Sequence, residues 1–455
     1  MGLHARWLAS ALIACLLGCG GGGSESGVPA GRESGPCYSD KTCNAGLACV
    51  ANVCVLKQVV DSGRVPVDAG TTTPTDAAFQ PAPHPALPQV ADLGGTVIAS
   101  PRVQPVVFAA DTSAQATTTF LSQMAQSSYW QAATAEYGVG TLEVLPAITL
   151  SSQPPATITD QLIQSTISDN TSGSNPAWGP ADPSTIYLMV LPSGTIGSLP
   201  DGSTCCHDFG GYHGQAPVDT SNVPYAVSCS CAGAVAGQGL TSLQQRTMAI
   251  SHELIEASTD PFPGSNPAYA GTENADLIWT VITGGEVADM CAFNPDLVYT
   301  LPGTSYAVQR SWSNLAAKAT TNPCVPAPSG PYFNSFPALT SITVSAGGMT
   351  FPTQGLVIPL GQSKTVDVTL FSTAPIGDWT VNAYTLEEVL GETNTNLALS
   401  LDKGAGTNGD VLHLTLAPKS ANASLGGEGF VLISQYGQPG SAQFQTNLSM
   451  GLIVN

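Results

Sequence analysis

Residues 248–261 read MAISHELIEASTDP, and this stretch decides how the central part of the chain folds. If it is helical, Ile250, Leu254 and Ala257 lie on one apolar face, at steps of four and three residues. Apolar side chains continue onto the flanks of that face. The pattern therefore predicts a helix over 240–258 that is mostly buried.

Three ionisable residues, His252, Glu253 and Glu256, lie within this helix. A buried charge is costly unless it is paired or bound to a metal. His252 and Glu256 are four residues apart and share a face, the spacing by which the helix of a zinc protease offers two ligands to one ion. Glu253 then takes the position of the general base. Glu256 stands where such helices usually have a second histidine, but catalytic zinc sites also use mixed histidine and glutamate ligands.

A third ligand is needed, and the segment 285–289, which reads GEVAD, offers two carboxylates. We expect Glu286 to bind the metal, with Asp289 or Asp260 bracing the histidine from behind. His213, in a Gly-Tyr-His-Gly segment, is the competing ligand or a donor to the transition state.

Other interpretations of these residues stay open. His207 is a weaker candidate ligand. Calcium is possible because the acids outnumber the histidines, although His252 is a poor calcium ligand. In the plainest alternative, the acids face solvent and His252 is a hydrogen-bonded core residue that binds no metal.

The start of the chain has the features of a secretion signal. A short basic region with His4 and Arg6 precedes an apolar stretch over 7–17, which is too short to span a bilayer as a stable helix. The stretch ends in Leu-Leu-Gly-Cys, which resembles a lipobox, so residues 1–18 are predicted to be a lipoprotein signal peptide and Cys19 to be acylated. The alternative is an ordinary signal peptide with an incidental cysteine. The prediction is an exported protein anchored by lipid at the outer membrane or cell surface.

The charge of the chain excludes one class of partner. Its 455 residues include 12 Lys and Arg against 32 Asp and Glu, and only 10% of all residues are charged. This balance argues against nucleic acid or anionic lipid as a partner. The expected partners are the membrane, through the lipid, and an extracellular peptide, protein or wall polymer.

Four cysteines are crowded near the N-terminus: Cys37, Cys43, Cys49 and Cys54. So few residues cannot bury a core without cross-links, and the segment 37–54 is predicted to be a disulfide knot. Of the three possible pairings, Cys37–Cys49 with Cys43–Cys54 is our choice. A four-cysteine zinc site is the alternative, but the spacings lack C-x-x-C pairs.

Six more cysteines follow in the central part: Cys205, Cys206, Cys229, Cys231, Cys291 and Cys324. An even number in an exported domain implies three disulfides. Because adjacent cysteines seldom bond to each other, Cys205 and Cys206 are expected to reach Cys229 and Cys231. Cys291 is then left to pair with Cys324.

The remaining sequence divides into spacers and two larger domains. A flexible tether is predicted over 19–36, and a Pro/Thr/Ala-rich linker over 55–91. In the domain over 92–325, strands are predicted at 103–110, 142–150, 185–191 and 225–228, and helices at 113–127, 129–137, 156–168 and 240–258, which gives a mixed fold of the α/β or α+β class. Alternating runs at 341–344, 364–371, 410–416 and 430–433 predict an all-β immunoglobulin-like sandwich over 326–455.

Several short segments between Val103 and Cys324 resemble the EXORDIUM (phosphate-induced protein) family and its bacterial relatives. They are Val106-Val107-Phe108, Ser128-Tyr129-Trp130, Glu136-Tyr137-Gly138-Val139-Gly140, Gly211-Tyr212-His213, Ser251-His252-Glu253-Leu254 with Glu256, Thr259-Asp260-Pro261, Glu286-Val287-Ala288-Asp289-Met290-Cys291 and Trp312-Ser313-Asn314. Each is short, and their order carries the resemblance. Members of the family are extracellular and wall-associated. The resemblance implies an α+β fold of the zincin-like kind, a mixed sheet with the His-Glu helix beside it, without implying proteolysis.

Taken together, the sequence predicts a surface-anchored lipoprotein with a zinc metallopeptidase-like domain that hydrolyses extracellular peptide bonds. The alternative is a non-catalytic extracellular binding or structural module, in which the helix holds a structural metal or none. In that case the β-sandwich would bind wall polymer or protein.

Overall fold

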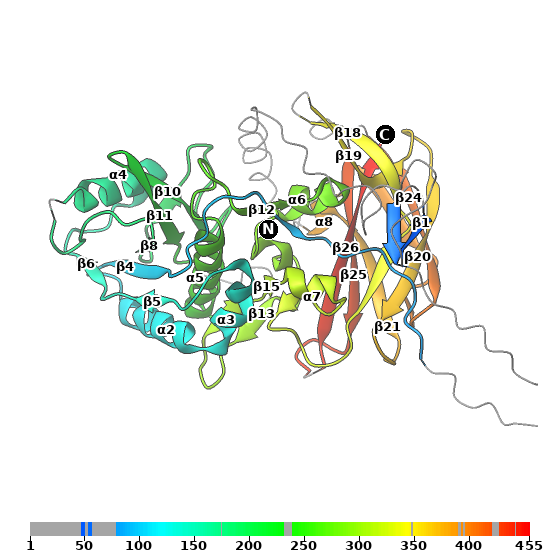
Figure 1. Cartoon of the computed structure of the whole chain (residues 1–455), viewed down its shortest axis with the longest axis horizontal. Coiled ribbons are helices and arrows are strands. Elements are labelled where there is room, and N and C mark those ends of the chain that lie inside the picture. The colour runs from blue at the N-terminus through cyan, green and yellow to red at the C-terminus, as the bar shows by residue number, and fades with distance from the viewer. Residues whose placement is uncertain are drawn as a thin grey trace, which may run out of the picture. The chain divides into compact units, whose positions relative to one another are not determined.

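The computed structural model (Figure 1) describes residues 47–50, 53–56, 79–173, 175–231, 239–346, 349–389, 393–394, 396–420, 427–441 and 443–455. Residues 79–455 belong to one compact unit, and residues 47–56 belong to another. In the small unit, β1 (Leu47–Val50) pairs antiparallel with β2 (Val53–Leu56), and the backbone of Cys49 lies opposite that of Cys54. The signal peptide, Cys19, the tether, and the knot pairings that involve Cys37 and Cys43 all lie outside the described residues.

The first half of the large unit is built on a mixed sheet with the order β10-β11-β8-β4-β5, in which β6 also pairs with β4. Strands β11, β8, β4, β5 and β6 are paired in parallel, whereas β10 is antiparallel at one edge. The strands are β4 (Arg102–Phe108), β5 (Glu143–Val144), β6 (Ile148–Leu150), β8 (Thr185–Val190), β10 (Gly211–Val218) and β11 (Ser221–Ser228). The sheet therefore places its antiparallel edge strand next to the loops rich in cysteine.

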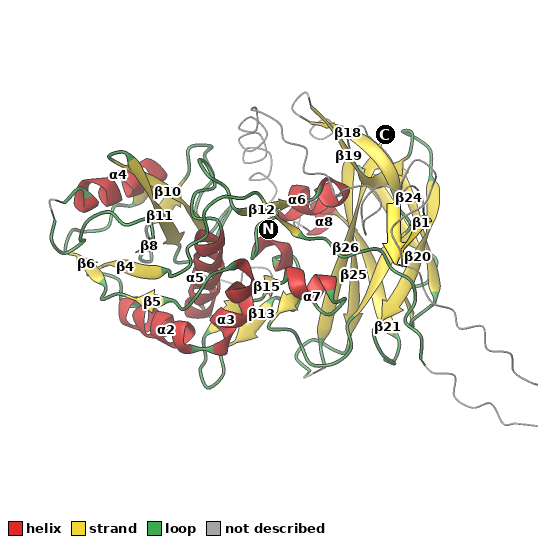
Figure 2. Cartoon of the chain, viewed as in Figure 1, coloured by secondary structure: helices red, strands yellow, loops and turns green. Residues whose placement is uncertain are grey.

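Both faces of this sheet are covered by helices (Figure 2), as expected because its central strands β4 and β8 are buried along almost their whole length. Along β8, Ile186, Leu188 and Val190 pack on one face, while Tyr187 and Met189 pack on the other. The first face is covered by α2 (Ala114–Gln126), α3 (Ser128–Thr134) and α5 (Ser242–Thr259), and the second by α4 (Asp160–Thr171). Helix α5 is thus held between the sheet and the rest of the apolar core.

Helix α5 has clear sequence signals at both ends. Thr241 and Gln244 form a capping box, in which each side chain bonds to the backbone of the other residue. The helix ends before Asp260 because Pro261 disfavours the helical conformation in the residue that precedes it. The prediction of a buried helix here is confirmed, with bounds shifted by one or two residues.

Short elements precede the sheet, lie between its strands, or connect it to the C-terminal half. They are β3 (Val90–Asp92), η1 (Ala135–Tyr137), β7 (Thr157–Thr159), β9 (Ile196–Ser198), β12 (Tyr269–Thr272), η2 (Asn274–Asp276), α6 (Leu277–Thr283), η3 (Asp289–Cys291), β13 (Val298–Thr300), β14 (Ala307–Gln309), β15 (Ser311–Trp312), α7 (Asn314–Lys318) and β16 (Cys324–Val325). Antiparallel pairs form between β3 and β12, β13 and β14, and β15 and β16, whereas β7 and β9 are parallel. Helix α6 and the loop after it lead directly into the candidate site.

The C-terminal half consists of two sheets that enclose an apolar core. Their orders are β17-β20-β24-β22 and β18-β19-β26-β25-β21-β23. The elements are β17 (Phe333–Pro337), β18 (Thr340–Ala346), β19 (Met349–Val357), β20 (Lys364–Ser372), β21 (Trp379–Thr385), α8 (Leu386–Val389), β22 (Leu397–Leu401), β23 (Ala405–Gly406), β24 (Val411–Pro418), β25 (Glu428–Tyr436) and β26 (Gln445–Val454). Val368 and Leu414 from the first sheet share this core with Trp379 and Phe430 from the second. The chain is therefore an α+β protein with many strands, as predicted.

The two halves of the large unit share apolar contacts across position 326. Ile278 and Ile282 of α6 belong to the same core as Leu448 and Met450 of β26. Gly429 of β25 lies where an added Cβ would be only 3.2 Å from Ile282 and 3.4 Å from Ile278, so glycine permits this close approach. Helix α6, from which the next loop starts, is thereby packed against the C-terminal sheets.

The end of the predicted linker over 55–91 differs from expectation, because residues 79–91 are extended but packed. The ring of His84 lies 4.1 Å from that of Phe371, and Leu87 is buried. The backbone N–H and carbonyl of Val90 both bond to the side chain of Asn314. Composition alone marks this segment as a spacer, whereas the apolar surface beside it supplies the packing.

The bounds of two other predicted elements also change, and one strand was not predicted. The strand expected at 142–150 is divided into β5 and β6, with Pro146 between them. The helix expected at 156–168 begins at Asp160, after Thr159 caps it by accepting from the N–H of Leu162. Residues 211–218, where neither a strand nor a helix was predicted, form β10.

Three disulfides join the central cysteines as predicted: Cys205–Cys229, Cys206–Cys231 and Cys291–Cys324. The first two connect the segment before β10 to the end of β11, and the third closes the loop after α6. None of the described helices is long and apolar enough to span a membrane.

Candidate metal centre

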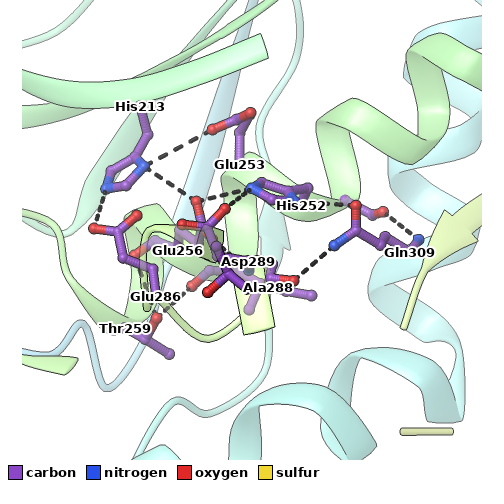
Figure 3. A network of polar contacts seen from close by, with 12 residues as sticks. His213, His252, Glu253, Glu256, Thr259, Glu286, Ala288, Asp289 and Gln309 are labelled. Atoms are coloured by element: carbon purple, nitrogen blue, oxygen red, sulfur yellow. Dashed lines mark hydrogen bonds and ion pairs between the residues drawn. The ribbon is translucent and has the colours of Figure 1, made fainter. Parts of the chain in front are cut away.

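Helix α5 delivers His252, Glu253 and Glu256 to one buried cluster of polar side chains (Figure 3). The Nε2 atom of His252 lies 3.0 Å from Oε2 of Glu256, so the four-residue spacing places the two side chains together as predicted. The side chain of His252 is 16% exposed and that of Glu256 is 3% exposed. The pair therefore lies under the protein surface, with limited access from the side of His252.

Strand β10 contributes a second histidine to the cluster. Nδ1 of His213 lies 3.6 Å from Oε2 of Glu256 and 3.8 Å from Oε2 of Glu253. Gly211 allows this approach, because a Cβ there would lie 2.9 Å from the side chain of Glu253. The competing ligand named from the sequence is thus part of the same site.

The loop after α6 brings two more carboxylates. Oε1 of Glu286 lies 3.8 Å from Nε2 of His213, and Oδ1 of Asp289 lies 3.5 Å from Nε2 of His252. Gly284 starts the turn with a φ of +101°, and a Cβ at this position would lie 2.1 Å from Oδ2 of Asp289. A glycine is required here both by the backbone conformation and by the space that Asp289 occupies.

Backbone contacts hold this loop on several sides. The N–H of Asp289 donates to Oε1 of Glu256 at 3.0 Å, and the N–H of Trp312 donates to the carbonyl of Val287 at 2.8 Å. The Cys291–Cys324 disulfide closes the loop just beyond them. The positions of Glu286 and Asp289 are therefore fixed by the fold.

Gln309 of β14 orients His252, a role that the sequence alone did not indicate. The Gln309 side chain donates through Nε2 to the carbonyl of Ala288 at 2.7 Å, which fixes Oε1 as the acceptor on the other side. That oxygen lies 3.1 Å from Nδ1 of His252, so Nδ1 carries the hydrogen. In neutral His252, the lone pair of Nε2 then points at the carboxylates of Glu256 and Asp289, a repulsive arrangement unless a proton or a cation lies between them.

Burial and mutual repulsion govern the protonation of the carboxylates. Burial raises the pKa of Asp289 to about 7, with Glu256 adding to the rise and His252 opposing it. Burial also raises the pKa of Glu286 well above its usual range, and it raises the pKa values of Glu253 and Asp260. Such a cluster attracts cations or protons.

Glu256 behaves differently from the other four acids. Burial alone would raise its pKa, but His252 and His213 hold it below its usual range. For the two histidines, burial lowers the pKa, but the surrounding carboxylates outweigh it and raise both values well above the usual range. Glu256 is therefore the acid that stays ionised most readily at the centre of the cluster.

Two buried polar atoms of the cluster have no hydrogen-bond partner in the described part of the chain: Nε2 of His213 and Oδ2 of Asp260. The ion pairs of the cluster among the described residues involve its histidines and no lysine or arginine. The donor set fits a divalent metal ion, because imidazole and carboxylate groups suit zinc. Calcium, the other candidate ion, prefers oxygen ligands and fits less well beside two histidines.

The potential ligand atoms form two groups that share one residue. His213, Glu256 and Glu286 make one group, and His252, Glu253 and Glu256 make the other, with atoms within 4.8 Å of one another in each. The trio chosen from the sequence, His252, Glu256 and Glu286, is thus divided between the two groups. His207 is 76% exposed, pairs with Asp208 and belongs to neither.

Comparison of the chain with protein-family models, curated protein sequences and solved structures finds no match.

Proposed function

We propose that this protein is a metal-dependent hydrolase that cleaves peptide bonds outside the cytoplasm. The observation that carries the proposal is the position of Glu253. It follows His252 in the sequence, and its carboxylate lies 3.8 Å from His213 in the same cluster of candidate ligands. Glu253 therefore lies beside the proposed metal position. It takes no part in the two shortest ion pairs of the cluster, which join His252 to Glu256 and to Asp289.

Each residue has a defined task in this mechanism. Zinc, the proposed ion, would be held by Glu256 together with the histidines and carboxylates around it, and it would polarise the scissile carbonyl and acidify a water molecule. Burial raises the pKa of Glu253, which brings this carboxylate closer to the range of a general base at neutral pH. Glu253 would take the proton from the attacking water and pass it to the leaving amine.

The fold around the site supports a zincin-like architecture. Helix α5 carries the His-Glu pair and packs beside a mixed sheet whose edge strand, β10, is antiparallel. The segments that resemble the EXORDIUM family supply the helix, His213 and the loop with Glu286 and Asp289. In the C-terminal half, two sheets around one apolar core support an immunoglobulin-like sandwich.

The proposed location is the outer membrane or cell surface, with the chain tethered by lipid on Cys19. The Leu-Leu-Gly-Cys segment and the three disulfides of the central domain both support an exported protein. The acidic net charge of −20 supports an extracellular peptide, protein or wall polymer as partner over nucleic acid.

A non-catalytic module with a structural metal is the second candidate, and burial favours it. Structural metal sites are closed, and the side chains of His213, Glu253 and Glu256 are at most 7% exposed. Against this, Glu286 and Asp289 are 19% and 23% exposed, so one side of the cluster is open to solvent. The two candidates differ in whether the metal-loaded protein cleaves peptides.

A peptide-library cleavage assay with zinc-loaded mature protein tests the proposal. The parent should cleave, whereas Glu253→Gln should lose about 100-fold or more of the rate because the general base is removed. Glu143→Gln, at an exposed residue of β5, is the matched control and should cleave like the parent. A zinc-loaded parent that cleaves no peptide would leave the structural module as the function.

A further inference from the structure

Glu256 lies at the centre of the cluster and faces both histidines with the same oxygen. Its Oε2 atom is 3.0 Å from Nε2 of His252 and 3.6 Å from Nδ1 of His213. Each histidine also has a carboxylate of its own, since Asp289 lies beside His252 and Glu286 lies beside His213. Figure 3 shows the two histidines on different sides of Glu256.

Within the cluster, two polar atoms that have no hydrogen-bond partner among the described residues lie on the side of Glu286. They are Nε2 of His213, which faces Glu286, and Oδ2 of Asp260. Asp260 is fully buried, and its other oxygen accepts from the N–H of Ala268 at 2.8 Å. A single ion between His252, Glu256 and Asp289 would leave Nε2 of His213 without a partner, and Asp260 beside Glu286 without a cation between them.

The charge of the cluster also favours more than one bound cation. Five buried or half-buried carboxylates gather here: Glu253, Glu256, Asp260, Glu286 and Asp289. With neutral imidazoles and all five carboxylates ionised, as metal binding requires, they carry five negative charges, and the ion pairs of the described residues bring no lysine or arginine to them. One divalent cation offsets two of these charges, whereas two cations offset four. Uncompensated buried charge is costly, so the second cation has a large electrostatic benefit.

We propose that the cluster is a dinuclear metal centre in which Glu256 bridges two divalent cations. The first cation is held by His252, Glu256 and Asp289. The second is held by His213, Glu286 and Asp260, together with Glu256. Paired ions of this kind, about 3.5–4 Å apart, can act on both the attacking and the leaving group of a hydrolysed bond. The inference rests on the proposed function, because it concerns the same site.

Metal stoichiometry of the full-length mature protein tests this inference without an activity measurement. After reconstitution with zinc and removal of excess by gel filtration, elemental analysis should give about two zinc ions per chain in the parent. Glu286→Gln should retain about one, and so should Asp260→Asn, which removes one charge with little change in shape. His413→Ala is the matched control: it alters a half-exposed histidine that pairs with Asp402 at 2.8 Å, and it should bind as many ions as the parent.

Manganese gives a second readout of the distance between the ions. In the Mn(II)-loaded parent, electron paramagnetic resonance should show a spin-coupled pair, and Glu286→Gln should show an isolated ion. Far-UV circular dichroism of each variant checks that it is folded. If Glu286→Gln does not fold, Asp260→Asn takes its place in the comparison with the parent. One zinc in both the parent and the variants overturns the dinuclear centre but leaves the proposed function intact. No bound zinc in the parent overturns both.

Discussion

The salt bridge between Arg246 and Asp111 provides a test of how helix α5 is fixed in place. Nη1 of Arg246 lies 2.9 Å from Oδ2 of Asp111, and Nη2 donates to the carbonyl of Leu191 at 2.8 Å. The two charged side chains are only 3% and 4% exposed. This contact ties the helix that carries the metal site to the ends of β4 and β8.

Replacing Arg246 with Met keeps much of the side-chain volume but leaves Asp111 buried without its cation. Removing one partner of a buried ion pair typically costs about 3–5 kcal/mol, because the other charge remains uncompensated. Arg102→Met is the matched control, since Arg102 pairs with Asp182 at the surface, where both side chains are more than one-third exposed. A surface pair of this kind contributes about 0–1 kcal/mol.

Thermal and urea unfolding of the oxidised protein, followed by circular dichroism, measures both losses. Arg246→Met should lower the free energy of unfolding by several kcal/mol and the melting temperature by several degrees. Adding Asp111→Asn should restore part of the loss, because the stranded charge is gone while the bonds from Ser113 can persist. An Arg246→Met variant as stable as Arg102→Met would refute the reasoning.

Three further predictions concern pH, metal and anchoring. Burial, with Glu273 adding to the effect, raises the pKa of Asp276 from 3.8 to about 6, so stability should fall as the pH rises from about 4 to about 6 and then stay constant. Asp276→Asn should therefore stabilise the fold by about 3 kcal/mol at pH 8, and by much less below pH 4. A pH-independent effect in unfolding experiments would contradict this. Removing zinc by dialysis against a chelator should lower the unfolding free energy by about 3 kcal/mol. The reference is the protein in a free zinc concentration about 100 times the dissociation constant. An unchanged melting temperature would count against a bound metal. Cys19→Ala should leave uncleaved precursor or release soluble protein, and unchanged recovery of lipidated protein in the detergent phase would exclude the lipobox.

The sequence alone was sufficient to predict the contacts that follow from local periodicity. Helix α5 could be predicted from its apolar face, and the proximity of His252 to Glu256 followed from their spacing. The disulfides of Cys205 and Cys206 could also be predicted, because adjacent cysteines rarely pair with each other.

Contacts between segments far apart in the sequence could not be predicted in this way. Strand β10 contains Gly211, Gly214 and Pro217, residues that disfavour strands, so its pairing with β11 and the position of His213 depend on the whole sheet. Gln309 lies 57 residues after His252, and a glutamine in a short strand gives no signal of such a contact. The association of Glu286 with His213 depends on the turn at Gly284, which the sequence indicates only as a glycine pair.

Zinc K-edge X-ray absorption of the reconstituted full-length protein, compared with Glu256→Gln, tests the central claim most directly. The parent should show nitrogen and oxygen ligands at about 2.0–2.2 Å, with the scattering pattern of imidazole and without the sulfur shell expected at about 2.3 Å for cysteine. Glu256→Gln should lose zinc, because this carboxylate belongs to both groups of candidate ligands. A parent that binds no zinc, or zinc bound through sulfur, would contradict the account and leave His252 as a core histidine held by Gln309.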